Sequence, residues 1–254
     1  IKGMFYGCSL ISDLTALEKW HVSNITNFSY VFYGCTSLSN IEPLGKWNVS
    51  NGTNFSDMFR SCTSLSNIQS LKKWKVSASI NFQNMFYECI SLKNIEYIRN
   101  WSVANCVNFK YMFCNCSSLV DIKPLENWNV SNGNDIEGIF SRCTVLSDIT
   151  PLANWKVSKC VNFSFIFNMC ISLANIEPLK NWDVSNGTDF QSSFSECPSL
   201  SNITPLKGWN VSNGNNFRRM FYDCSILSDI SPLQNWNLSK GINFESMFSE
   251  CTLL

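Results

Sequence analysis

The chain has 254 residues, of which 45% are apolar, so it can bury a sizeable core. Nineteen basic and nineteen acidic residues cancel, and no basic cluster is large enough to neutralise several phosphates, which argues against a nucleic-acid partner. No apolar run reaches the roughly 18 residues that a membrane helix needs, and these 254 residues contain no signal-peptide pattern. We therefore expect no membrane span in this section.

Cysteine and tryptophan recur with a strict period of 27 residues. The cysteines of this ladder are Cys8, Cys35, Cys62, Cys89, Cys116, Cys143, Cys170, Cys197, Cys224 and Cys251. The tryptophans are Trp20, Trp47, Trp74, Trp101, Trp128, Trp155, Trp182, Trp209 and Trp236. A fixed period of about 20 to 50 residues indicates stacked repeats. We predict a single solenoid of about nine 27-residue repeats over residues 1–254, a section of a longer chain, because both ends fall inside a repeat.

Within each repeat, the cysteine is counted as position 1. A Thr–Pro pair such as Thr150–Pro151 suits the start of a helix. We therefore predict a single helical turn, either α or 3₁₀, that ends near Trp155. Trp47 and Val49 then alternate with polar residues, which predicts a short strand. The isoleucine at position 7, as at Ile41 and Ile68, allows a second extended segment. The Ser185–Thr188 segment has the composition of a loop.

The last third of the repeat carries apolar residues at i, i+3, i+4, i+7 and i+10, namely Phe55, Met58, Phe59, Cys62 and Leu65. This spacing predicts an amphipathic helix of about three turns, capped by Asn54. Parallel strands stack about 4.8 Å apart, whereas packed helices need roughly 8–10 Å. We therefore expect an α/β repeat solenoid with one short strand and one main helix per coil, curved with the strands on the concave face.

The pattern C-x-S-L-x-x-I-x-P-L followed by M-F-x-x-C resembles the BspA-like leucine-rich-repeat surface proteins. The segment from Trp47 to Asn54 is similar to the Trp-x-x-Ser-Asn-x-Thr-Asn units of one branch of that family. The resemblance implies a leucine-rich-repeat-like solenoid and a role in surface attachment, adhesion or host interaction. It brings no catalytic residue. Two departures are a longer unit and a proline where a regular strand residue is expected.

The cysteine ladder admits disulfides, a metal site or buried free thiols. One cysteine per coil on the apolar face favours free thiols in the core. Cys106, Cys114 and Cys160 lie outside the ladder, and we expect the more reactive thiols among them. The tryptophan ladder is either a carbohydrate platform or core, and the core is favoured because nine exposed indoles would form a large apolar patch.

The remaining recurrent polar residues favour structural roles over chemistry. Position 6 is always Asn or Asp, which we interpret as a turn residue in preference to a calcium ligand. His21 is the only histidine and has no partner that would make it a general base. We therefore predict no catalytic, cofactor or metal site, and no enzyme. Candidate glycosylation sequons begin at Asn24, Asn48, Asn129, Asn186, Asn210 and Asn237.

Three functions fit these features. The first is a non-enzymatic cell-surface or extracellular protein that binds a protein or a glycan. The second is a structural subunit of a rod, sheath or filament, with copies of itself as partner. The third is an intracellular scaffold, with a cytoplasmic location, which free thiols tolerate better than an oxidising exterior. In each case the function must lie in the polar positions that differ between coils.

Overall fold

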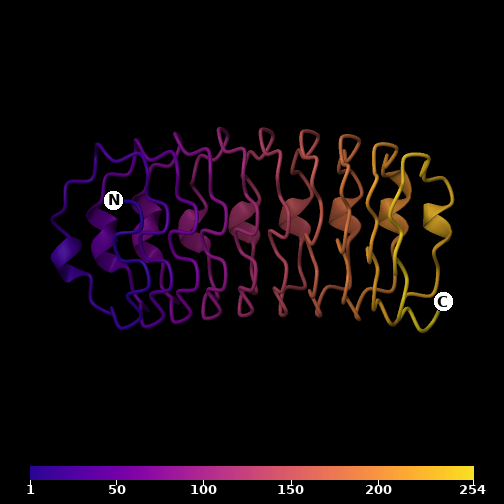
Figure 1. Cartoon of the computed structure of the whole chain (residues 1–254), viewed down its shortest axis with the longest axis horizontal. Helices are drawn as coiled ribbons and strands as arrows, with labels where there is room; N and C mark the ends of the chain where they lie inside the picture. The colour runs from indigo at the N-terminus through magenta and orange to yellow at the C-terminus, as the bar shows by residue number, and fades with distance from the viewer.

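The structure, a computed structural model, describes residues 1–254 as an elongated stack of coils, one repeat per turn of the chain (Figure 1). The predicted repeat solenoid is confirmed. A 3₁₀ helix recurs in each coil, and these helices follow one another along the long axis. Their bounds are η1 Thr15–Leu17, η2 Glu42–Lys46, η3 Gln69–Lys73, η4 Glu96–Ile98, η5 Lys123–Leu125, η6 Thr150–Leu152, η7 Glu177–Leu179, η8 Thr204–Gly208 and η9 Ser231–Leu233.

The 3₁₀ helices begin where the Asn or Asp of position 6 turns the chain. Asn40 Oδ1 accepts the backbone N–H of Glu42 at 2.9 Å, and Asp148 does the same for Thr150 at 2.8 Å. A proline follows in most coils and fixes φ near the helical value. The short helical turn was therefore predicted correctly, and position 6 has the turn geometry expected of a side chain that bonds its own backbone.

The predicted three-turn helix is wrong, because positions 21–24 form one four-residue turn and position 25 to the next cysteine forms a second. The Met58 N–H donates to the Phe55 carbonyl at 3.2 Å, and the Cys62 N–H donates to the Phe59 carbonyl at 3.1 Å. The third residue of each turn has a positive φ, as Asp57 does at 56°. Two four-residue turns direct apolar side chains inward at nearly the spacing of a helix. The buried face was therefore predicted correctly although its conformation was not.

The N–H groups that a helix would use internally bond the next coil instead. Asp57 N–H donates to the Gln83 carbonyl at 2.8 Å, and Phe59 N–H donates to the Met85 carbonyl at 3.0 Å. Asn54, predicted as a helix cap, accepts the N–H of Ser56 at 2.9 Å and so opens the first turn. Its backbone also forms parallel bridges to the neighbouring coils. These hydrogen bonds between coils stabilise the turns in place of a helix.

The predicted strand at the tryptophan is also wrong. Trp47 is extended, with φ −69° and ψ 127°, yet the parallel bridges of the chain are isolated ones at positions 20 and 6. At the tryptophan, neighbouring coils are joined by a side chain, because Trp47 Nε1–H donates to the Leu17 carbonyl at 2.9 Å. No backbone hydrogen bond joins Trp47–Val49 to Trp20–Val22. Strands on a concave face are therefore absent.

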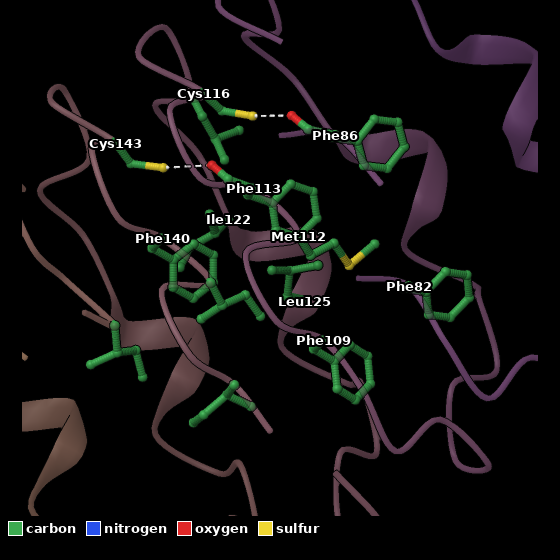
Figure 2. Close-up of a cluster of buried hydrophobic side chains, with 14 of the residues drawn as sticks. Phe82, Phe86, Phe109, Met112, Phe113, Cys116, Ile122, Leu125, Phe140 and Cys143 are labelled. Atoms are coloured by element: carbon green, nitrogen blue, oxygen red, sulfur yellow. Dashed lines mark hydrogen bonds between the residues drawn. The ribbon is translucent and has the colours of Figure 1, made fainter. Parts of the chain in front are cut away.

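The core is one continuous cluster of 75 buried residues that runs the length of the stack. Phenylalanines at positions 21 and 25 form two rows, and the Phe113 ring lies 5.8 Å from Phe86 and 6.1 Å from Phe140 (Figure 2). Each coil thus buries its apolar side chains against its neighbours, as expected for a repeat protein. No helix of this chain has the length and apolar character needed to span a membrane.

Candidate functional site

The ladder cysteines lie in the core as free thiols, except for the exposed Cys8. Each buried thiol donates to the carbonyl of the phenylalanine 30 residues earlier: Cys116 to Phe86 at 3.1 Å, and Cys143 to Phe113 at 3.2 Å (Figure 2). Burial raises the pKa of the Cys116 thiol well above its ordinary value. A neutral, hydrogen-bonded thiol neither attacks an electrophile nor binds a metal readily. The ladder cysteines therefore have a structural role, in packing and in hydrogen bonds between coils.

The three off-ladder cysteines are buried as well. Burial raises the pKa of Cys106 to about 12, of Cys114 to about 11 and of Cys160 to about 12. The expectation that these are reactive thiols is therefore wrong, because a nucleophilic cysteine needs a lowered pKa and access to solvent. No group of three or more His, Cys, Asp and Glu side chains lies close enough together to hold a metal ion.

The tryptophan indoles lie between coils. Trp47 to Trp236 are all buried, whereas Trp20 is half-buried. Their Nε1–H groups donate to backbone carbonyls of the preceding coil, as in Trp128 to Ile98 at 3.2 Å. Since the ring faces lie inside the stack, they form no platform for a sugar.

The variable polar residues near the tryptophan lie on the surface. His21 is exposed, as are the six asparagines that open the candidate sequons. Asn48 Oδ1 accepts the Ser50 N–H at 3.2 Å, whereas Asn186 Nδ2 donates to the Ser158 carbonyl at 2.8 Å. A glycan on Asn186 would be attached to Nδ2, the atom whose hydrogen bond joins two coils, so glycosylation would compete with that contact.

A different set of residues gathers on the outer side of the turns. We call this surface the turn face and define it as positions 22, 23, 26 and 27 of every coil. Six of the seven tyrosines lie there, together with four of the five arginines. Its aromatic and arginine side chains are Tyr6, Tyr30, Tyr33, Tyr87, Tyr111, Phe165, Tyr222, Arg60, Arg142, Arg218 and Arg219. Tyrosine and arginine are enriched among residues that dominate protein interfaces.

Planar side chains stack from coil to coil along position 26 of the turn face. The Tyr6 and Tyr33 rings lie 4.5 Å apart and nearly parallel. The Arg60 guanidinium follows, 5.5 Å from the Tyr33 ring and 4.4 Å from the Tyr87 ring, within the range of cation–π attraction. Asp57, which is 2% exposed, holds Arg60 through a 3.2 Å hydrogen bond. The row is therefore a rigid, half-exposed strip.

The strip ends in a hollow of about 470 Å³, because position 26 changes to the small residues Cys114 and Ser141. Its lining comes entirely from the turn face: Arg60, Gln83, Asn84, Tyr87, Lys110, Tyr111, Cys114, Ser141, Arg142, Phe165 and Asn168. The Tyr111 ring occupies the space above Gly138, where an added Cβ would overlap it. Glu137 accepts hydrogen bonds from the Tyr111 hydroxyl and from Lys110, which fixes this wall.

Two buried polar atoms in this cluster have no hydrogen-bond partner, Arg60 Nε and Asn84 Oδ1. Asn84 is 5% exposed, and its Nδ2 donates to Asp57 Oδ1 at 3.0 Å. Arg60 donates to the same oxygen. One unmatched donor and one unmatched acceptor therefore flank a single carboxylate. Buried polar groups of this kind are rare in folded proteins.

A second hollow, of about 600 Å³, lies on η1, η2 and η3. Three acidic residues and three lysines line it, namely Asp13, Glu18, Glu42, Lys46, Lys72 and Lys73, and no aromatic ring does. This hollow is open and polar, and its charges largely compensate one another. It indicates a hydrated groove with no preference for a ligand class.

Sequence reasoning placed the variable surface beside the tryptophan and missed the turn face. The missed signal was the restriction of tyrosine and arginine to the same few repeat positions. This signal was overlooked because we expected a helix over these residues. In such a helix, positions 22, 23, 26 and 27 would form only its polar, solvent-facing side.

The DUF285 family, described as "Mycoplasma protein of unknown function", matches residues 1–120, 65–176 and 148–254, which together span the chain. The chain belongs to the DUF285 family. A comparison with curated proteins gives no match.

The solved structures to which this DUF285 chain is similar include bacterial leucine-rich-repeat proteins. The T. pallidum leucine rich repeat protein is 20% identical, with 68% of this chain and 69% of that chain covered and a TM-score of 0.40. A leucine-rich repeat protein from Eubacterium ventriosum is 15% identical over 91% and 82%, with a TM-score of 0.38. A leucine rich cell surface protein from Faecalibacterium prausnitzii is 14% identical over 87% and 76%, with a TM-score of 0.21.

Proposed function

We propose that this chain is a non-enzymatic cell-surface protein that binds a partner on another surface through its turn face. The observation that carries the proposal is the concentration of tyrosine and arginine on that face. Such side chains provide large, rigid contact areas and directional hydrogen bonds. Lysines are instead concentrated near the 3₁₀ helices and loops, as Lys72, Lys156 and Lys207 are, and lysine is depleted in interfaces.

Backbone conformation gives a second reason. Positions 23 and 27 have positive φ in every coil, where glycine and asparagine are the unstrained choices. Yet sixteen of these twenty sites carry a side chain other than hydrogen, including Tyr30, Phe165 and Arg219. Folding alone does not favour a bulky residue there. Strained positions that retain large side chains support a function for those side chains.

Adhesion of coated beads tests the proposal. Beads carrying the purified chain are applied to cultured epithelial cells under flow, beside beads carrying the variant Tyr6→Ser, Tyr30→Ser, Tyr33→Ser. Losing three hot-spot tyrosines should reduce the number of retained beads by at least about fivefold. These three residues do not line the hollow, so the variant leaves every lining residue of the hollow in place.

The matched control replaces three exposed lysines away from the turn face, as Lys72→Ser, Lys73→Ser and Lys75→Ser. We expect adhesion within about twofold of the unmodified chain. Equal adhesion by the tyrosine variant, or equal loss in both variants, would refute the turn face as the binding surface. Antibody staining of intact cells that express the protein tests its surface location.

A further inference from the structure

We infer that the hollow between Tyr87 and Phe165 on the turn face binds an acidic sugar, a single ring bearing a carboxylate. This inference rests on the proposed function and gives the chemical class of one ligand of that surface. Its size suits the ligand, because about 470 Å³ accommodates a sugar ring but not a folded partner segment. Three features of the lining select such a ring.

The first feature is a pair of polar atoms without hydrogen-bond partners, on the side of the hollow formed by Arg60 and Asn84. Arg60 Nε is a buried donor without an acceptor, and Asn84 Oδ1 is a buried acceptor without a donor. Both side chains line the hollow. A hydroxyl accepts and donates hydrogen bonds at the same time. Both atoms are closed to solvent in this structure, so a small turn of the Arg60 and Asn84 side chains toward the hollow would bring them to a ligand. Sugar hydroxyls would then supply the partners that both groups lack, which a purely apolar or purely anionic ligand would not.

The second feature is the charge of the lining. Arg60, Lys110 and Arg142 line the hollow, and no carboxylate does. Arg60 is paired with Asp57 and Lys110 with Glu137, whereas Arg142 takes part in none of the five salt bridges. Arg142 is exposed and free to form a bidentate bond to a carboxylate. One uncompensated guanidinium thus favours a ligand with one negative charge.

The third feature is the aromatic walls. Tyr87 and Tyr111 bound the hollow on one side, with their rings perpendicular and 6.3 Å apart, and Phe165 bounds it on the other. Aromatic rings pack against the C–H face of a sugar while planar amides bond its hydroxyls. Gln83 and Asn168 contribute such amides to the lining.

Calorimetry and NMR titration of the full chain with glucuronate test the inference. Glucuronate should bind with a Kd on the order of 1 mM, and glucose at least about tenfold more weakly, because it lacks the carboxylate that Arg142 would bind. Amide signals of the turns around Tyr111 and Ser141 should shift, and those of the 3₁₀ helices should not. Arg142→Gln should weaken glucuronate binding about tenfold.

Arg219→Gln is the matched control, since Arg219 is also exposed, on the turn face and outside every salt bridge, but not at the hollow. It should leave Kd unchanged. Asn84→Gly removes the unmatched acceptor at a positive φ of 54° that glycine adopts freely, and should weaken glucose and glucuronate alike. Acetate binding as tightly as glucuronate would overturn the sugar assignment, as would equal losses in Arg142→Gln and Arg219→Gln. Absent glucuronate binding with intact tyrosine-dependent adhesion would refute the hollow alone.

Discussion

The inner and outer sides of the same eight-residue turn segment differ sharply. Inward, positions 21 and 25 are phenylalanine in almost every coil, and the cysteine of position 1 bonds the preceding coil throughout. Outward, positions 22, 23, 26 and 27 carry serine, tyrosine, arginine, lysine, acids, amides or glycine with no fixed order. One backbone thus carries an invariant packing surface and a variable one. In a repeat protein, invariance marks what stacking requires, and variation marks where a partner can be distinguished.

Alkaline pH should destabilise the packing of the inner side along the whole stack and so unfold the protein. The buried thiols have pKa values raised by burial, for example to about 12 at Cys224, against about 8.5 in the unfolded chain. Above pH 8.5 the unfolded chain therefore releases protons that the folded chain keeps, and each such thiol lowers the free energy of unfolding by about 1.4 kcal/mol per pH unit. Several thiols together should destroy the fold between about pH 9 and 11.

The urea midpoint followed by tryptophan fluorescence, measured from pH 7 to 11, checks this loss. Cys116→Val removes one titrating thiol. The free energy of unfolding should therefore fall less steeply with pH, by the contribution of one proton. A midpoint independent of pH up to 10.5 would contradict the burial of protonated thiols.

Phe113→Ala should have the next largest effect. Phe113 is fully buried between the rings of Phe86 and Phe140 (Figure 2), and truncation leaves a cavity in the middle of the stack. We expect a loss of about 3–5 kcal/mol in the free energy of unfolding, measured by urea denaturation. Lys156→Ala, on an exposed side chain, should change it by less than about 0.5 kcal/mol. Similar values for the two variants would contradict the packing of the phenylalanine row.

Gly138→Ala should lower the stability of the fold and also disturb the turn face, with a smaller loss of stability than Phe113→Ala. Gly138 has φ 57°, and an added Cβ would overlap the Tyr111 ring. We expect a loss of about 1–3 kcal/mol in stability and displacement of Tyr111 from Glu137, visible in NMR spectra of the tyrosine ring. Gly208→Ala is the control, since its φ is not positive and no heavy atom lies within 4 Å of the added Cβ. Equal stability of the two variants would argue against the position of Tyr111.

The solenoid and its buried residues could be predicted from the sequence, because a 27-residue period and apolar spacing report stacking directly. It did not reveal the turns, since Phe55, Phe59 and Cys62 have the spacing of a helix in either conformation. The deciding factor was the hydrogen bonding of Asp57 and Phe59 to the next coil, a tertiary preference that outweighs local periodicity. The hollow was also hidden, because Cys114, Ser141 and Arg142 adjoin Tyr87 only through stacking.

The most direct test of this account is to relieve the strained positions of the outer side while recording stability and adhesion together. Tyr30→Asn, Phe165→Asn and Arg219→Asn place a residue that tolerates positive φ at three sites where φ is 60°, 58° and 53°. If these side chains serve binding and not folding, the combined variant should be as stable as the original or more stable, by up to about 2 kcal/mol, and its coated beads should adhere several-fold less. A destabilised variant that adheres as well as the original would contradict the account.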